Sequence, residues 1–241
     1  MTVFALVHGG WHGGWCWDLV AAELSSRGHR AVAVDLPAED PTAGAEEYAG
    51  AVVASLPTTP VLREGEQRRS RGRDDLVLVG HSLAGLALPL VAQVRPVRHV
   101  VYVAGMLPEP GRSVDDRAKA GERMTRRGLG RGQAAAPDGS TWWLPDAAVA
   151  VLYPDSPPQR ARAAAARLRP QQWRITAEPS PLASWPDVPG TYVLCRDDQV
   201  IDPGWARAAA VRHGLELVEL AGDHSPFLAR PAELADLLER V

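Results

Sequence analysis

The amino-acid sequence predicts an α/β protein with a mostly parallel, doubly wound sheet and a small inserted helical cap. Short runs rich in valine and other apolar residues alternate with alanine- and leucine-rich stretches of helical length, a pattern typical of strands joined by crossover helices. Several of these runs are apolar on both faces, as in a parallel sheet that helices cover on each side. One long stretch, 107–187, interrupts the alternation. We therefore expect a core made of 1–106 and 188–241, with 107–187 inserted as the cap.

The individual elements follow in order along the chain. Strands are expected at 3–7, 31–34, 76–79, 99–103, 191–195 and 216–220. Helices are expected between them, at 17–27, 45–55, 83–93, 205–212 and 231–240. Within the cap, two helical patterns occur at 115–127 and 157–168, and no strand pattern is evident. The charged, arginine- and glycine-rich stretch 57–75 predicts a surface loop.

Length and composition limit the classes of function. A chain of 241 residues suits one domain with a modest insertion. The net charge of −3 predicts no attraction to nucleic acid or to an anionic membrane, so the expected partner is a small molecule, and a homodimer stays open. The two cysteines form neither a disulfide framework nor a metal motif. Because no run reaches transmembrane length and no secretory signal pattern opens the chain, we expect a cytoplasmic location.

One serine follows an apolar run and precedes a helical pattern, in the segment Gly80-His81-Ser82-Leu83-Ala84-Gly85. A serine between a strand and a helix sits on a tight turn that exposes its Oγ above the sheet. The backbone N–H of Leu83 would begin the helix and point at a developing oxyanion. The usual pattern is Gly-x-Ser-x-Gly, and here Ala84 replaces the last glycine. We therefore predict Ser82 as a nucleophile, although the string by itself is common.

A second glycine-rich turn follows the first expected strand. Val7-His8-Gly9-Gly10 stands where such folds place the other oxyanion donor, and we expect that donor to be the N–H of Gly10. A simple strand-to-helix turn would also explain the glycines. His8 and His12 are four residues apart, a spacing that could suggest a metal. A helix is not expected in this glycine-rich stretch and no third ligand is evident, so we expect no metal.

A serine hydroxyl needs a base to become a nucleophile at neutral pH. His224 comes just after the last expected strand, at the carboxyl edge of the sheet, where open α/β folds bind ligands. His81 adjoins Ser82 but should point away from it. We therefore predict His224 as the general base.

The imidazole of such a base must be held in one tautomer by an acceptor. Asp197 and Asp198 are both candidates, because they end the preceding strand. We favour Asp198, since Asp-x-Val-Ile matches the usual acid loop of this kind of fold, and Asp202 is a third option. The order Ser, Asp, His is that of one class of serine hydrolases.

These motifs together resemble the esterase and hydroxynitrile lyase branch of the α/β-hydrolase superfamily, which includes plant methylesterases. The resemblance spans nearly the whole chain and rests on residues 7–17, 80–83, 192–198 and 222–224. It implies an α/β-hydrolase fold with a parallel-sheet core and a helical cap, and neither a metal nor an organic cofactor. In the lyases, threonine, glutamate and lysine are typical where this chain has Gly9, His81 and Ser225, so all three positions favour an esterase.

The predicted function is a serine hydrolase that cleaves a carboxylic ester of a small, mostly apolar substrate through an acyl-enzyme. One alternative uses the same triad for acyl transfer in a biosynthetic pathway, lactone opening, or cofactor-free lyase or cyclisation chemistry. Another is a small-molecule binding protein of the same fold.

Several apolar residues are expected to line a substrate pocket. For each of them, packing in the core is an equal alternative, and only one of the adjacent tryptophans should line the site. The expected pocket residues are Trp11, Met106, Met124, Trp142, Trp143, Leu152 and Phe227.

Overall fold

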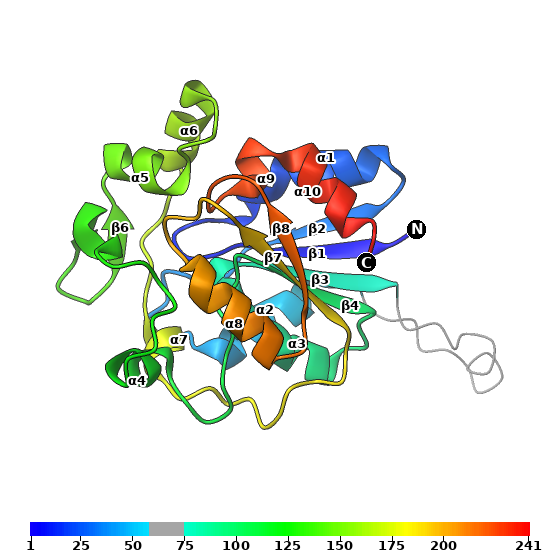
Figure 1. The fold of residues 1–241 in the computed structure, drawn as a ribbon, viewed down its shortest axis with the longest axis horizontal. Coiled ribbons are helices and arrows are strands. Elements are labelled where there is room, and N and C mark those ends of the chain that lie inside the picture. The colour runs from blue at the N-terminus through cyan, green and yellow to red at the C-terminus, as the bar shows by residue number, and fades with distance from the viewer. Residues whose placement is uncertain (58–74) are drawn as a thin grey trace.

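A six-stranded parallel sheet forms the centre of the protein in a computed structural model that describes residues 1–57 and 75–241 (Figure 1). The strand order is β2-β1-β3-β4-β7-β8, and every neighbouring pair is parallel. All six expected strands are confirmed. Their bounds are β1 Val3–Val7, β2 Arg30–Val34, β3 Leu76–His81, β4 His99–Val103, β7 Gly190–Cys195 and β8 Glu216–Leu220.

Helices cover both faces of the sheet, which confirms the doubly wound architecture (Figure 1). On one face lie α1 Asp18–Ser26, α9 Pro226–Ala229 and α10 Pro231–Leu238. On the other lie α2 Ala45–Ser55, α3 Leu88–Val94 and α8 Pro203–Arg212. The helix expected at 17–27 begins with a 3-10 turn over Gly14–Trp17, and the one expected at 83–93 is divided into a 3-10 turn, Ser82–Leu86, and α3. Pro89 in the first turn of α3 fits this division, because proline is tolerated only where a helix starts.

Burial along the strands explains why the central ones read as continuous apolar runs. All six residues of β3 are buried, whereas in β2 and β8, at the two edges of the sheet, only the last residue is buried. The parallel register brings Val7 opposite Gly80 and Gly80 opposite Tyr102, so consecutive strands end at the same edge. The loops that follow β1, β3, β7 and β8 therefore meet there.

The stretch 107–187 lies over that carboxyl edge (Figure 1). It contains α4 Val114–Lys119, β5 Gln133–Ala135, β6 Thr141–Trp143, α5 Pro145–Leu152, α6 Pro158–Ala165 and α7 Arg174–Ala177, with a 3-10 turn at Leu129–Gly132. The helix expected at 157–168 is present as α6. The one expected at 115–127 ends at Lys119, because Gly121 follows in a left-handed conformation, with φ at 93°, that closes the helix. The division into core and cap domains stays a prediction.

The expectation that the cap holds no strand is wrong. β5 and β6 form an antiparallel hairpin around Asp138 and Gly139, and Gly139 has a φ of 84°. Strands of three residues are too short to show an alternating pattern. The Asp-Gly pair is nevertheless a hairpin signal that the sequence carries.

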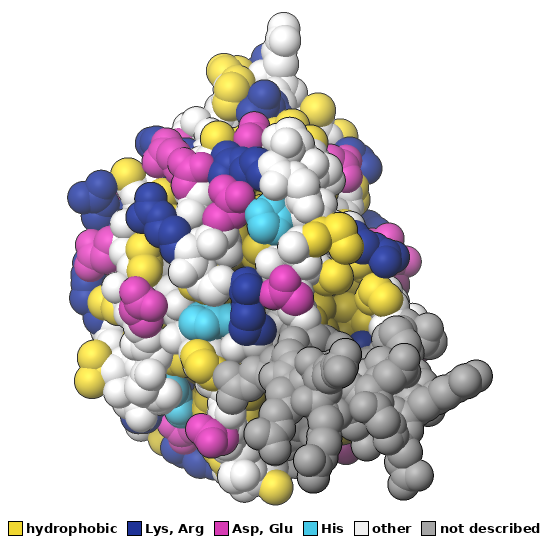
Figure 2. Space-filling view, turned by 90° about the vertical axis from the view of Figure 1, so that its right-hand side faces the viewer, with side chains coloured by type: hydrophobic (Ala, Val, Ile, Leu, Met, Phe, Trp, Pro, Cys, Tyr) yellow, Lys and Arg dark blue, Asp and Glu magenta, His cyan; other side chains and the backbone are white. Residues whose placement is uncertain are grey.

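Two further expectations concern the surface. The loop expected at 57–75 falls on residues 58–74, which lie outside the described part of the chain. Among the described residues on the face at the amino ends of the strands, basic and acidic side chains are mixed and form no patch of one sign (Figure 2). Ion pairs such as Arg27–Glu239, at 2.7 Å, account for part of that mixture. Among the described helices, none is both long enough and apolar enough to cross a membrane.

Candidate active site

Ser82 stands at the end of β3 on a strained turn. Its φ is 51°, a left-handed value that a non-glycine residue seldom adopts, and the 3-10 turn starts at the same residue. The Ser82 carbonyl accepts a hydrogen bond from Met106 N–H at 2.9 Å, which ties the turn to the loop after β4. A Cβ on Gly85 would lie 2.3 Å from the Met106 carbonyl oxygen. The glycine displaced to position 85 is therefore what lets the turn pack against that loop.

The loop after β1 lies directly against the Ser82 turn. A Cβ on Gly9 would lie 2.7 Å from His81 Nδ1 and 2.8 Å from Ser82 Cβ, so only glycine fits here without displacing its neighbours. Gly10 and Leu83 line the same cavity as Ser82. Neither of their backbone N–H groups donates to another described residue. Two free amides thus border the space beside the serine.

A buried side chain of the cap fixes the position of this loop. Trp11 has a φ of 62°, and its N–H donates to Gln171 Oε1 at 3.2 Å. Gln171 is fully buried and also donates to the Tyr48 hydroxyl at 2.9 Å. Sequence reasoning missed Gln171, because a glutamine in an irregular stretch gives no local sign that it is buried.

The three candidate aspartates have different surroundings. His224 Nδ1 donates to Asp198 Oδ2 at 2.9 Å, and both side chains are buried. Asp198 Oδ1 accepts the N–H groups of Val200 and Ile201 at 2.7 and 3.0 Å, which fixes the carboxylate. The exposed Asp197 accepts from Gly222 N–H at 3.2 Å.

The third candidate, Asp202, accepts from Trp205 N–H at 2.9 Å and caps α8. Of the three aspartates, the structure brings only Asp198 to His224.

His81 connects the serine turn to the loop that carries His224. Its Nε2–H donates to the His224 carbonyl at 2.8 Å, and the two rings lie 4.5 Å apart, centre to centre. His81 is fully buried, and its Nδ1 has no partner among the described residues. Burial, together with the neighbouring histidines, lowers the pKa of His81 well below the usual value. The ring is therefore neutral at physiological pH.

His8 and His12 use both of their nitrogens within the protein. His8 Nδ1–H donates to the Gly9 carbonyl at 2.8 Å, and its Nε2 accepts Leu36 N–H at 3.0 Å. His12 Nδ1–H donates to the Gly10 carbonyl at 2.8 Å, and its Nε2 accepts the Tyr153 hydroxyl at 2.8 Å. Burial lowers the pKa of His8 to about 4 and that of His12 to about 3. These bonds leave neither ring a lone pair to offer a metal.

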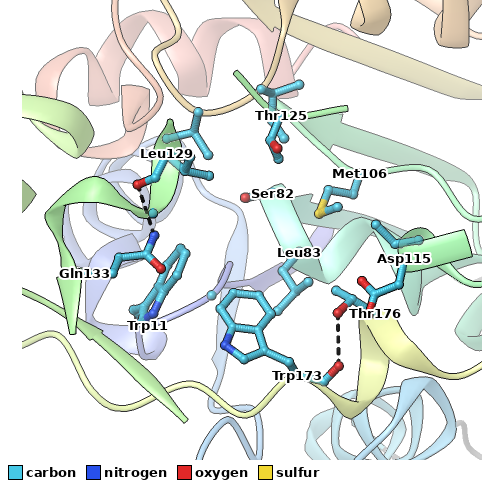
Figure 3. A pocket seen from close by; sticks show the side chains of 15 residues that line it. Trp11, Ser82, Leu83, Met106, Asp115, Thr125, Leu129, Gln133, Trp173 and Thr176 are labelled. Carbon is cyan, nitrogen blue, oxygen red and sulfur yellow. Dashed lines mark hydrogen bonds between the residues drawn. The ribbon is translucent and has the colours of Figure 1, made fainter. Parts of the chain in front are cut away.

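A cavity of about 410 Å³ opens above Ser82 (Figure 3). Two of the expected pocket residues, Trp11 and Met106, line it. Thr141 Oγ1 accepts the indole N–H groups of both Trp11 and Trp173, each at 3.1 Å, and so holds the two aromatic walls to β6. The remaining lining residues were not predicted as pocket residues; they are Val114, Asp115, Thr125, Leu129, Gly130, Gln133, Trp173, Thr176, Val200 and Ile201.

The other five expected pocket residues lie away from this cavity. Trp142 points outward and is 38% exposed, whereas its neighbour Trp143 is buried and packs edge-on against Trp11, with ring centres 5.5 Å apart. Alternation along β6 separates the two side chains, as expected for adjacent residues. Phe227 is fully buried against His81, and Met124 and Leu152 belong to the hydrophobic core. Trp143, Phe227, Met124 and Leu152 therefore satisfy the core-packing alternative, whereas the exposed Trp142 neither lines the cavity nor packs in the core.

The sequence is similar to known proteins over nearly its whole length. A family model described as "Alpha/beta hydrolase family" matches residues 4–237. The rice protein "Probable esterase PIR7A" (Oryza sativa subsp. indica) is 31% identical over 99% of this chain and 95% of its own length. "Methyl jasmonate esterase 1" of Vitis vinifera is 24% identical over 99% of this chain and 95% of its own length.

A solved structure extends the comparison to the fold. A pyrethroid hydrolase from Sphingobium faniae JZ-2 superposes with a TM-score of 0.77 at 23% identity, covering 99% of this chain and 96% of its own. At that identity the likeness concerns the fold, and it confirms the predicted α/β-hydrolase architecture.

Proposed function

This chain belongs to the alpha/beta hydrolase family, in the branch of the plant esterases, and on that premise we propose that it cleaves carboxylic esters through a serine nucleophile. One observation carries the proposal. A strained serine and two free backbone amides border one cavity, and a buried histidine–aspartate pair lies on loops that follow strands at the same edge of the sheet. The substrate would be a small, mostly apolar ester. A cytoplasmic location and a homodimer stay proposals from the sequence.

The first half of the reaction would be acyl transfer to the enzyme. Ser82 Oγ attacks the ester carbonyl while His224 takes its proton, and the carboxylate of Asp198 stabilises the imidazolium that results. The N–H groups of Gly10 and Leu83 donate to the oxyanion, and one such donor is typically worth about a hundred- to thousandfold in rate. His224 then returns the proton to the leaving alcohol, so that an acyl-enzyme remains.

The second half would be hydrolysis of that acyl-enzyme. A water molecule gives its proton to His224 and attacks the acyl carbon, and the oxyanion again receives hydrogen bonds from the two amides. Collapse of the intermediate releases the carboxylic acid and returns the proton to Ser82.

Chemical labelling combined with one substitution tests the proposal. A fluorophosphonate should add once, on the peptide that contains Ser82, and the wild type should hydrolyse 4-nitrophenyl butyrate. Ser82→Ala should lose both properties, with a fall in kcat of about 10⁵- to 10⁶-fold, as for other serine nucleophiles. Ser55→Ala, on the exposed surface of α2, is the matched control and should behave like the wild type. Labelling on another serine, or full activity of Ser82→Ala, would overturn the assignment.

A further inference from the structure

The cavity above Ser82 has a single charged wall. Asp115, on α4, lines it, and among the described residues that form the lining no other side chain carries a charge. No ion pair or hydrogen bond to another described residue engages its carboxylate, and the residue is exposed. The carboxylate is therefore open to a ligand in the cavity.

Asp115 has a polar and an aromatic neighbour on the same side of the cavity. α4 packs against α7, and Thr176 on α7 lies beside Asp115, away from Gln133 and Leu129 (Figure 3). The Thr176 hydroxyl donates to the Trp173 carbonyl at 3.0 Å, so its oxygen keeps lone pairs that can accept from a ligand. The indole of Trp173 also lines the cavity, and an aromatic face attracts a cation.

Helix stability alone does not account for Asp115. An acidic residue in the first turn stabilises a helix, and both Asp115 and Asp116 stand there. Asp116 performs that role through Ser113 and Lys119, and these contacts lower the pKa of its carboxyl. Asp115 makes no comparable contact, and only Asp115 lines the cavity.

We propose that Asp115 is a specificity-determining residue that favours esters carrying a cationic ammonium group at the end remote from the scissile carbonyl. The inference rests on the proposed ester-cleaving function. An ammonium group would lie beside the Asp115 carboxylate and the Trp173 ring, while the apolar part of the substrate contacts Met106 and Leu83. An anionic substrate would meet repulsion from the same carboxylate.

Three 4-nitrophenyl esters of matched size provide the test. Their acyl chains end in a trimethylammonium group, an isosteric tert-butyl group or a carboxylate. At low salt, the ratio of kcat/KM for the cationic ester to that for the neutral one should fall about three- to fivefold in Asp115→Asn, as expected for a partly screened charge pair. In the same variant, the ratio of kcat/KM for the anionic ester to that for the neutral one should rise. Added salt should shrink both effects in the wild type.

Asp116→Asn is the matched control, because it removes a neighbouring charge of the same helix turn that does not line the cavity. Its ratios should stay within about twofold of the wild type. Because each ratio compares two esters on the same protein sample, it does not depend on the fraction of that sample that is folded and active. If the esters are hydrolysed but Asp115→Asn leaves their ratios unchanged, only this inference falls. If the wild type hydrolyses 4-nitrophenyl butyrate but none of the three, again only this inference falls. If it hydrolyses neither the butyrate nor the three esters, the proposed function fails and the inference falls with it.

Discussion

The two sides of the cavity are built in different ways. On the sheet side, the lining residue Ser82 is buried at the end of a strand. Asp198 and His224 do not line the cavity, but they too are buried just after strand ends, and hydrogen bonds to backbone groups fix the Asp198 carboxylate. On the cap side, the lining comes from short helices, turns and a three-residue strand. Residues such as Leu129 and Gln133 are only half-buried.

Such a division would separate the proposed chemistry, on the sheet side, from substrate selectivity, on the cap side. Reacting groups must be held to within a fraction of an ångström, and the ends of neighbouring parallel strands provide such positions. The walls that contact the rest of a substrate tolerate more movement and more change. We therefore expect substitutions on the sheet side to lower kcat by orders of magnitude, and those on the cap side to change KM and substrate preference by small factors.

After the loss expected for Ser82→Ala, the largest effect is expected at the acid of the proposed triad. In Asp198→Asn the amide would still accept from Val200 and Ile201 but would present its NH₂ group to His224 and hold the wrong tautomer. The corresponding change in another serine hydrolase lowers kcat by about 10⁴. Asp197→Asn, which removes a charge that faces Gly222, should change kcat by less than about tenfold. Steady-state kinetics of both variants on one activated ester provide the measurement. If Asp197→Asn were the inactive variant, Asp197 rather than Asp198 would be the acid of the triad.

A second prediction concerns the buried neutral histidines on the sheet side. The pKa is lowered to about 4 for His8 and about 3 for His12, against 6.5 in an unfolded chain. Below pH 6.5 the unfolded state therefore binds protons that the folded state does not. The free energy of unfolding should therefore be independent of these two histidines above pH 6.5. It should fall as pH drops from 6.5 towards 4, by about 1.4 kcal/mol per pH unit for each histidine.

Urea unfolding at several pH values between 7.5 and 4.5 measures this dependence. His12→Gln should lower the slope of unfolding free energy against pH, whatever its effect at pH 7.5. His29→Gln is the control, because His29 lies near the surface and its ring contacts Glu239. Equal slopes for the wild type and His12→Gln would contradict the prediction.

The smallest effect is expected on the cap side, at the hydroxyl that accepts from two tryptophans. Thr141→Val keeps the shape of the side chain but leaves the indole N–H groups of Trp11 and Trp173 without their acceptor. The two walls should loosen, so KM should rise about three- to tenfold, which corresponds to about 1 kcal/mol, while kcat changes little. Thr141→Ser restores the acceptor and should restore KM. A large fall in kcat at constant KM would show that the cap also positions the reacting groups.

Local sequence patterns predict the sheet and the proposed reacting groups. The six strands, the serine on its turn, and the histidine and aspartates after later strands all come from local patterns. An apolar run of strand length followed by glycine determines a turn within a few residues, and parallel strands then bring their carboxyl ends to one edge. The choice between Asp197 and Asp198 stayed open, because it depends on which way a short loop turns.

The walls of the cavity, by contrast, depend on packing between segments that are far apart in the sequence. Trp11 is held by Gln171, 160 residues further along the chain, and by Thr141, 130 residues away. Trp142 and Trp143 formed the obvious aromatic pair in the sequence, yet neither lines the cavity, whereas Trp173, Thr176 and Asp115 do. Local sequence patterns determine backbone conformation, but a side chain becomes a pocket wall only through packing between segments that are distant in the chain, and such contacts leave no periodic signal.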